Sequence, residues 1–83
     1  MISCEHFDYI EIACMYNYPI TLTLTSGDFI HGIALTTKVN NERQECIVVK
    51  DEVKERLVEL NTVKRMEANI ENPHFTYIDF TAQ

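Results

Sequence analysis

The spacing of the apolar residues changes near Pro19, and this change divides the chain into two kinds of structure. From Phe7 to Tyr16, apolar side chains recur at about 100° per residue, which is the period of a helix. Asp8 and Glu11 lie three residues apart on the remaining arc, so they are expected to be neighbours on its exposed side. Because the residue before a proline is pushed out of the α region, we expect a helix over about residues 5–18.

After Pro19 the apolar residues alternate with polar ones, which is the period of a strand. The stretch ITLTLT predicts the first strand, and Ser26-Gly27-Asp28 supplies turn residues after it. The same reasoning predicts four further strands, in residues 29–37, 44–50, 54–60 and 74–80. One short helix followed by five closely spaced strands, within about residues 19–80, predicts a mainly β fold with one N-terminal α-helix. We expect a strongly bent five-stranded antiparallel barrel.

The length of 83 residues suits one domain, so we expect residues 1–83 to form a single unit. No apolar run approaches the roughly 20 residues that cross a bilayer, and no basic segment followed by an apolar one opens the chain. We therefore expect a cytoplasmic protein with no membrane partner. The charged strand KERLVEL discourages edge-to-edge pairing, so we also expect a monomer.

The formal net charge of −6 conceals an uneven distribution of charge along the chain. Residues 1–37 contain four acidic residues and no Lys or Arg, whereas all seven basic residues lie between Lys38 and Arg65. Nucleic-acid binding requires clustered cations that neutralise phosphates, so the N-terminal half is not expected to bind nucleic acid directly. An acidic surface favours a partner with a basic surface instead.

The candidate catalytic and metal-binding residues form no recognisable motif. Cys4, Cys14 and Cys46 lack C-x-x-C spacing, which indicates reduced thiols rather than a disulfide framework or a zinc ribbon. A metal cluster of Cys4, His6 and Cys14 is the alternative, although cysteine is often a small buried hydrophobe. The chain has no nucleophile-elbow pattern and no phosphate-binding loop, so we expect neither an enzyme nor a cofactor.

The spacing of Leu24, Gly27 and Gly32 resembles the first motif of Sm-like barrels. The second Sm motif is a strand that ends in a basic residue followed by glycine, and this chain carries Glu59 and Asn61 there. The part of the Sm signature associated with RNA binding is therefore absent. An Sm-like RNA-binding module remains the alternative function, and it rests on the fold alone.

A pattern of four segments extends from about Ile2 to Phe80: CEHFDYIEIAC, ITLTLTSGD, ECIVV and LVELNTVKRM. This pattern resembles the Rho-binding antiterminator (Rof) family, small proteins that inhibit the transcription termination factor Rho. The resemblance implies an Sm-like barrel with an N-terminal helix. It also implies that the helix engages the RNA-binding domain of Rho in competition with RNA, so that the protein acts as an antiterminator.

Carried over position by position, the resemblance implies a partner-binding site on the helix and a second contact on the polar loop that follows the second predicted strand. The implied residues are Phe7, Asp8, Tyr9, Glu11, Asn40, Asn41 and Arg43. Two of them have alternative roles. The helical period places Tyr9 on the apolar side, where it would belong to the core, and Phe7 is equally suited to packing the helix onto the barrel as a hydrophobic staple.

Overall fold

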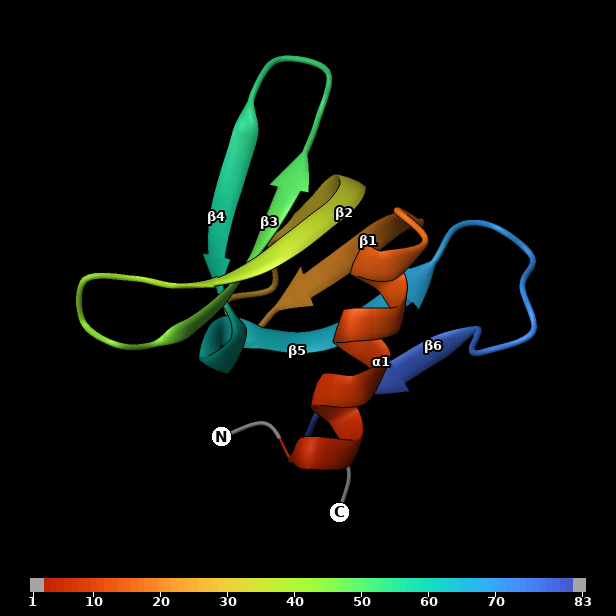
Figure 1. Ribbon diagram of the computed structural model, residues 1–83, viewed down its shortest axis with the longest axis horizontal. Coiled ribbons are helices and arrows are strands. Elements are labelled where there is room, and N and C mark those ends of the chain that lie inside the picture. The colour runs from red at the N-terminus through yellow and green to blue at the C-terminus, as the bar shows by residue number, and fades with distance from the viewer. Residues whose placement is uncertain (1–2, 82–83) are drawn as a thin grey trace.

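The computed structural model describes residues 3–81, and this part of the chain forms one α-helix packed against a six-stranded antiparallel sheet (Figure 1). The predicted mainly β fold with one N-terminal helix is confirmed. In chain order the elements are α1 (Cys4–Met15), β1 (Pro19–Leu24), β2 (Phe29–Val39), β3 (Glu45–Lys50), β4 (Glu55–Glu59), the 3₁₀-helix η1 (Leu60–Thr62), β5 (Val63–Ala68) and β6 (Tyr77–Asp79).

The strands are ordered β4-β3-β2-β1-β5-β6, and each neighbouring pair is antiparallel. The long strand β2 pairs with both β1 and β3, and Figure 1 shows the sheet bending between these two partners, with α1 lying across the side that holds β5 and β6. The end strands β4 and β6 do not pair with each other within residues 3–81. The sheet is strongly bent, as expected. Because its end strands do not pair, it does not close into a barrel.

The helix begins close to where the pattern predicts and ends earlier. Ser3 caps its N-terminus, where the Ser3 Oγ accepts a hydrogen bond from the backbone N–H of His6 at 3.2 Å. Its last residue is Met15, because Asn17 adopts a left-handed conformation with φ 51°. The Asn17 side-chain amide also donates to the carbonyl oxygen of Ala34 in β2 at 2.8 Å. No helix in this part of the chain is long and apolar enough to cross a membrane.

The strand β5 was missed by the prediction because its buried residues do not alternate. Val63 and Met66 are both buried, and a spacing of three is more typical of a helix than of a strand. The register of β5 against β1 shifts where Thr23 is followed by Leu24, which leaves Lys64 as an extra residue in β5. This β-bulge allows Val63 and Met66 to enter the same core.

The last predicted strand, residues 74–80, is shorter in the structure and comprises Tyr77–Asp79 alone. His74 and Phe75 belong instead to the connection between β5 and β6. The side-chain oxygen of Asn72 accepts hydrogen bonds from both of their backbone N–H groups, at 2.8 and 3.1 Å. This local turn holds Phe75 in a buried position against the helix.

The core forms where α1 packs on the inner face of the bent sheet. Ile10 and Ala13 are the buried residues of the helix, and they join Ile20 and Leu22 from β1. The bend requires a very close approach of β2 to β3 at Gly32, where an added Cβ would lie 2.5 Å from the carbonyl oxygen of Lys50. A side chain at this position would therefore force the two strands apart.

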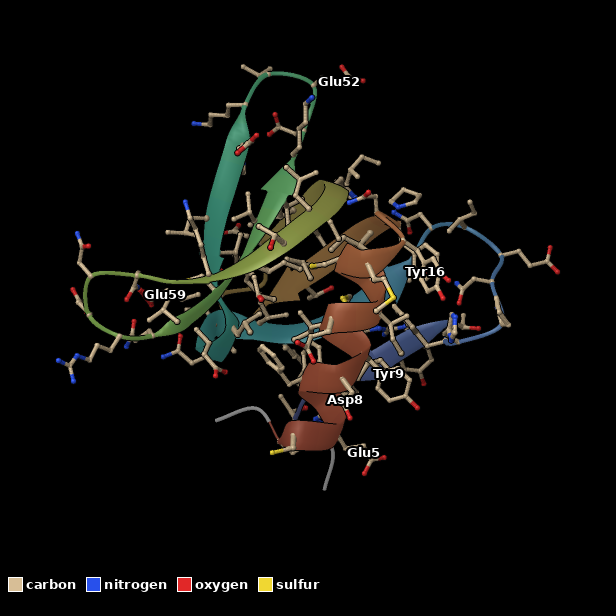
Figure 2. The ribbon with its side chains drawn as sticks, viewed as in Figure 1. Glu5, Asp8, Tyr9, Tyr16, Glu52 and Glu59 are labelled. Atoms are coloured by element: carbon tan, nitrogen blue, oxygen red, sulfur yellow. The ribbon has the colours of Figure 1, made fainter. Side chains whose placement is uncertain are left out.

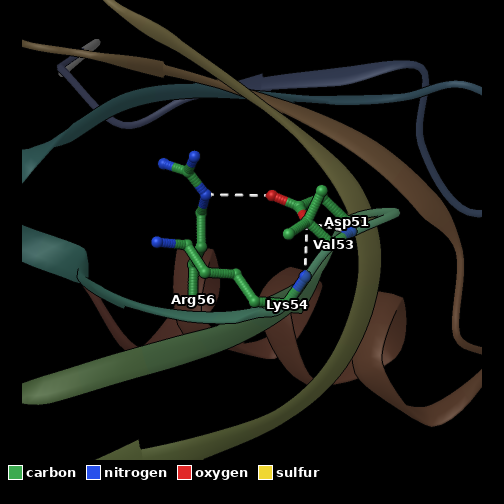
Figure 3. Close-up of polar contacts among 4 residues, drawn as sticks. All are labelled: Asp51, Val53, Lys54 and Arg56. Carbon is green, nitrogen blue, oxygen red and sulfur yellow. Dashed lines mark hydrogen bonds and ion pairs between the residues drawn. The ribbon is translucent and has the colours of Figure 1, made fainter.

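The hairpin between β3 and β4 is closed by one carboxylate (Figure 3). Asp51 accepts hydrogen bonds from the backbone N–H groups of Val53 and Lys54, each at 2.8 Å. It also forms an ion pair with the Arg56 side chain, whose Nε lies 3.0 Å from the carboxylate. These donors hold the pKa of the Asp51 carboxyl below its usual value, with the backbone N–H of Lys54 as the largest cause. The charge of Asp51 is thus compensated within the hairpin.

Candidate partner-binding surface

Three carboxylates lie along the exposed side of α1. Glu5, Asp8 and Glu11 are all exposed, and they follow one another at intervals of three residues. Figure 2 shows Glu5 and Asp8 on the N-terminal half of the helix. The ion pair between Arg56 and Asp51 is the only one found within residues 3–81. The helix carboxylates therefore make no ion pair with Lys or Arg in this part of the chain, in agreement with the absence of Lys and Arg from residues 1–37.

The two aromatic residues of the predicted site are both partly buried. Phe7 packs against the core cluster. A hydrophobic staple would pair it with residue 2, which lies outside the described residues. Tyr9 lies on the side of α1 that faces β6 (Figure 2), and its ring meets Phe75 edge to face with centroids 5.8 Å apart. Each ring thus has a structural role, and each keeps some exposed surface.

A groove of about 640 Å³ separates the start of α1 from the loop between β2 and β3. Its walls come from the helix, the loop and η1, and the lining residues are Cys4, Phe7, Asp8, Arg43, Gln44, Glu45, Leu60 and Asn61. The groove therefore brings together three predicted site residues, Phe7, Asp8 and Arg43. Glu11 lies by a separate hollow of about 270 Å³ that also includes Met15 and Leu35.

The loop between β2 and β3 has a defined conformation. The side-chain oxygen of Asn40 accepts hydrogen bonds from the backbone N–H groups of Glu42 and Gln44, both at 2.9 Å. The backbone N–H of Arg43 donates to the Asn40 carbonyl oxygen at 3.0 Å, and Arg43 itself adopts a left-handed conformation with φ 64°. Asn41 and Arg43 are exposed, whereas Asn40 is partly buried. The predicted loop residues consequently differ in what they can offer a partner.

Comparison with known proteins identifies the family to which this chain belongs. A family model described as ROF, modulator of Rho-dependent transcription termination, matches residues 1–80. The chain belongs to the ROF family. Rho-related modulation of transcription termination is thus its function at the level of the family, and the resemblance seen in the sequence is confirmed.

One solved structure supports the same assignment for the fold. The structure described as YaeO bound to magnesium, from Vibrio cholerae O395, is 42% identical to this chain with a TM-score of 0.86. The match covers 89% of this chain and 96% of that one. No curated protein matches the chain.

The alternative metal cluster of Cys4, His6 and Cys14 is not formed. Cys4 and Cys14 are ten residues apart on one helix, which separates their backbones by about 15 Å. Within residues 3–81 no group of three His, Cys, Asp or Glu side chains converges as metal ligands would. Burial, together with the neighbouring Glu11 carboxylate, raises the pKa of the Cys14 thiol to about 11, so this thiol stays protonated at neutral pH.

The remaining lining residues of the groove were not predicted from the sequence. Gln44 ends the loop between β2 and β3, Glu45 opens β3, and Leu60 and Asn61 belong to η1. These two pairs are distant in sequence from the helix and from each other. No local spacing signals this convergence. In the sequence, this corner of the fold is marked only by the departure of Glu59 and Asn61 from the second Sm motif.

Proposed function

We propose that this ROF protein inhibits Rho by binding the basic region of Rho that receives RNA, and thereby acts as an antiterminator. The observation that carries the proposal is the exposed pair Asp8 and Glu11 on α1, within 37 residues that contain no Lys or Arg. Exposed carboxylates attract Arg and Lys side chains, which are also the groups that bind the phosphates of RNA. Inhibition of this kind needs binding alone and no catalytic step.

The charge pattern supports both the strength and the rate of binding. Hydrogen bonds between a carboxylate and Arg or Lys are about twice as strong as neutral ones, so they give orientation as well as affinity. The uncompensated negative charge of α1 also accelerates association with a basic surface. The exposed parts of Phe7 and Tyr9 add ring surface beside these charges, where a guanidinium or ammonium group of Rho can pack.

The loop between β2 and β3 supplies the proposed second contact. Arg43 and Asp8 line opposite walls of one groove, so a partner segment that enters it can touch the helix and the loop at once. Asn41 and Arg43 are the exposed contacts of this loop, and Asn40 supports them from a partly buried position. These three residues complete the proposed site together with Phe7, Asp8, Tyr9 and Glu11. We expect this unit to bind as a monomer in the cytoplasm.

A second candidate function, RNA binding, is favoured by rings on the outer face of the sheet. Phe29 and His31 are stacked there with centroids 6.4 Å apart, and the Arg65 guanidinium lies 4.1 Å from the centre of the Tyr77 ring. Such rings can stack on bases. However, Glu67 occupies the same face, and a single guanidinium beside a carboxylate is a poor site for phosphates.

A competition experiment separates the two functions. Labelled RNA is bound to purified Rho, and the protein is added at increasing concentration. We expect RNA to be released from Rho, and we expect the protein alone to retain no RNA on a filter. Retention of RNA by the protein alone, without release from Rho, would instead support the RNA-binding module.

A further inference from the structure

Glu59, the last residue of β4, directs its carboxylate at the loop between β2 and β3. The Asn40 Nδ2 donates to the Glu59 Oε2 at 3.2 Å. The Gln44 amide, oriented with its nitrogen towards Glu59, donates to Oε1 at 3.0 Å and to Oε2 at 2.8 Å. Figure 2 shows Glu59 beside this loop and far from the carboxylates of α1. One carboxylate thus binds both ends of the loop.

The hydrogen bonds of Asn40 are used within the protein. Its side-chain oxygen accepts from two backbone N–H groups of the loop, and its side-chain nitrogen donates to Glu59. An amide offers two donors and one acceptor oxygen, so little of it is left for a partner. Asn40 and Glu59 are consequently better placed to hold the loop than to touch another protein.

We propose that Glu59 is a positioning residue that holds Asn40 and Gln44 and so presents Arg43 and Asn41 to Rho in a single conformation. This inference rests on the proposed function for the site itself. A loop that is ordered before binding loses less conformational freedom when the complex forms, and the complex is tighter for that reason. The residue that replaces the basic position of the second Sm motif therefore serves the neighbouring loop.

The charge of Glu59 fits this role. A carboxylate has room for several donors and binds them more strongly than a neutral acceptor does. Glutamine at this position would keep the shape and one acceptor oxygen, whereas alanine would release both amides. The pair of variants Glu59→Gln and Glu59→Ala therefore separates the acceptor from the side chain as a whole, and Glu52→Ala is a matched control because Glu52 lies in the exposed β3–β4 turn.

The first measurement concerns the free protein. Backbone ¹⁵N relaxation reports the order of residues 40–44 on a fast timescale. In Glu59→Ala we expect the heteronuclear NOE of Glu42 and Gln44 to fall to values typical of a mobile loop, with an intermediate effect in Glu59→Gln and none in Glu52→Ala. An unchanged loop in Glu59→Ala would overturn the proposal.

The second measurement concerns affinity for Rho. We expect the dissociation constant to rise about tenfold in Glu59→Ala, because the Asn40 and Gln44 amides no longer bind a charged group that orders the loop. It should be partly restored in Glu59→Gln. In an Arg43→Ala background, Glu59→Ala should raise the dissociation constant much less, because the Arg43 side chain that the loop positions is already absent. Full additivity of the two changes would mean that Glu59 does not act through Arg43. If wild-type protein fails to bind Rho, the proposed function is wrong, while the relaxation data still decide whether Glu59 orders the loop.

Discussion

The helix α1 and the β3–β4 hairpin both expose carboxylates, but they use them in opposite ways. In the hairpin, Asp51 binds two backbone N–H groups and the Arg56 side chain, so its charge closes the turn. On α1, Asp8 and Glu11 make no ion pair within residues 3–81, and no Lys or Arg precedes Lys38 in the chain. The Asp51 carboxylate is therefore bound within its own turn, whereas Asp8 and Glu11 on the helix surface are left for another molecule.

This difference bears on how acidic residues are interpreted in a small acidic protein. Carboxylates interleaved with Lys and Arg in sequence find local partners, and an exposed pair of this kind contributes little beyond local structure. Carboxylates in a long segment without cations have no such partner, and their mutual repulsion is tolerated because water screens it. The contrast predicts that changes of charge on α1 will alter binding and that equal changes on the hairpin will not.

The largest effect is expected from reversing the charge of the helix surface. The double variant Asp8→Lys with Glu11→Lys should fold, with a loss of roughly 0.3–1 kcal/mol for each cation near a helix N-terminus. Binding to Rho should weaken by at least about 2–5 kcal/mol, because attraction to a basic surface becomes repulsion. The measurements are the dissociation constant for Rho, a Rho-dependent termination assay and thermal melting of the variant.

The hairpin provides the control for this experiment. Glu52→Lys with Glu55→Lys introduces the same change of charge on exposed positions, and it should leave inhibition of Rho nearly intact. The single variants Asp8→Asn and Glu11→Gln should give graded losses between the two extremes. If the helix variant melts normally and still inhibits fully, α1 is not the inhibitory surface and the contrast between the regions has no functional meaning.

The sequence predicted the elements whose signals are local. The helix, the alternation of β1 and the polar turns are all encoded in neighbouring residues, and the exposure of Asp8 and Glu11 followed from helical spacing alone. The end of α1 was predicted three residues late because Asn17 is fixed by Ala34, a residue of β2. β5 was missed because its β-bulge exists only opposite β1.

The candidate site shows the same limit of local information. Helical spacing alone cannot place Asp8 beside Arg43, since their shared groove depends on how η1 and the loop fold against α1. The role of Glu59 depends on contacts with Asn40 and Gln44, which are 19 and 15 positions away in the chain. Predictions of surfaces from sequence are thus reliable for single exposed faces and fail where separate segments converge.

The next effect tests whether the aromatic side of α1 differs from its acidic side. Tyr9→Ala removes the edge-to-face contact with Phe75 and partly buried ring surface, so the free energy of unfolding should fall by about 1–3 kcal/mol. If Tyr9 acts mainly in the core, affinity for Rho should change less than in Asp8→Ala. Chemical denaturation and Rho binding, measured on both variants, test this ordering. A larger loss of affinity than of stability in Tyr9→Ala would place the ring in the interface.

A smaller effect is expected from salt. Surface charges are screened within about 10 Å at 0.1 M salt, so the association rate with Rho should fall by roughly tenfold between low and high salt, with a smaller change in the dissociation rate. Asp8→Asn should flatten this dependence, and Glu52→Gln on the hairpin should leave it unchanged. Stopped-flow or surface-binding kinetics at several salt concentrations provide the test. A rate independent of salt would indicate an apolar interface.

The smallest effect is expected from the hairpin itself, in stability against pH. Since the fold lowers the pKa of Asp51, its contribution to stability is complete above the ordinary value of 3.8 and is lost as the pH falls through the lower pKa of the folded state. Asp51→Asn should therefore lower the melting temperature by a few degrees at neutral pH and converge with the wild-type protein in acid. Inhibition of Rho at neutral pH should remain as in the wild type, because this carboxylate is engaged in its own turn. Melting curves from acid to neutral pH, with Glu52→Gln as the control, distinguish the two carboxylates. If Asp51→Asn follows the wild-type curve throughout, the turn does not depend on this charge. Asp51 would then contribute no more to stability than the carboxylates of the helix surface.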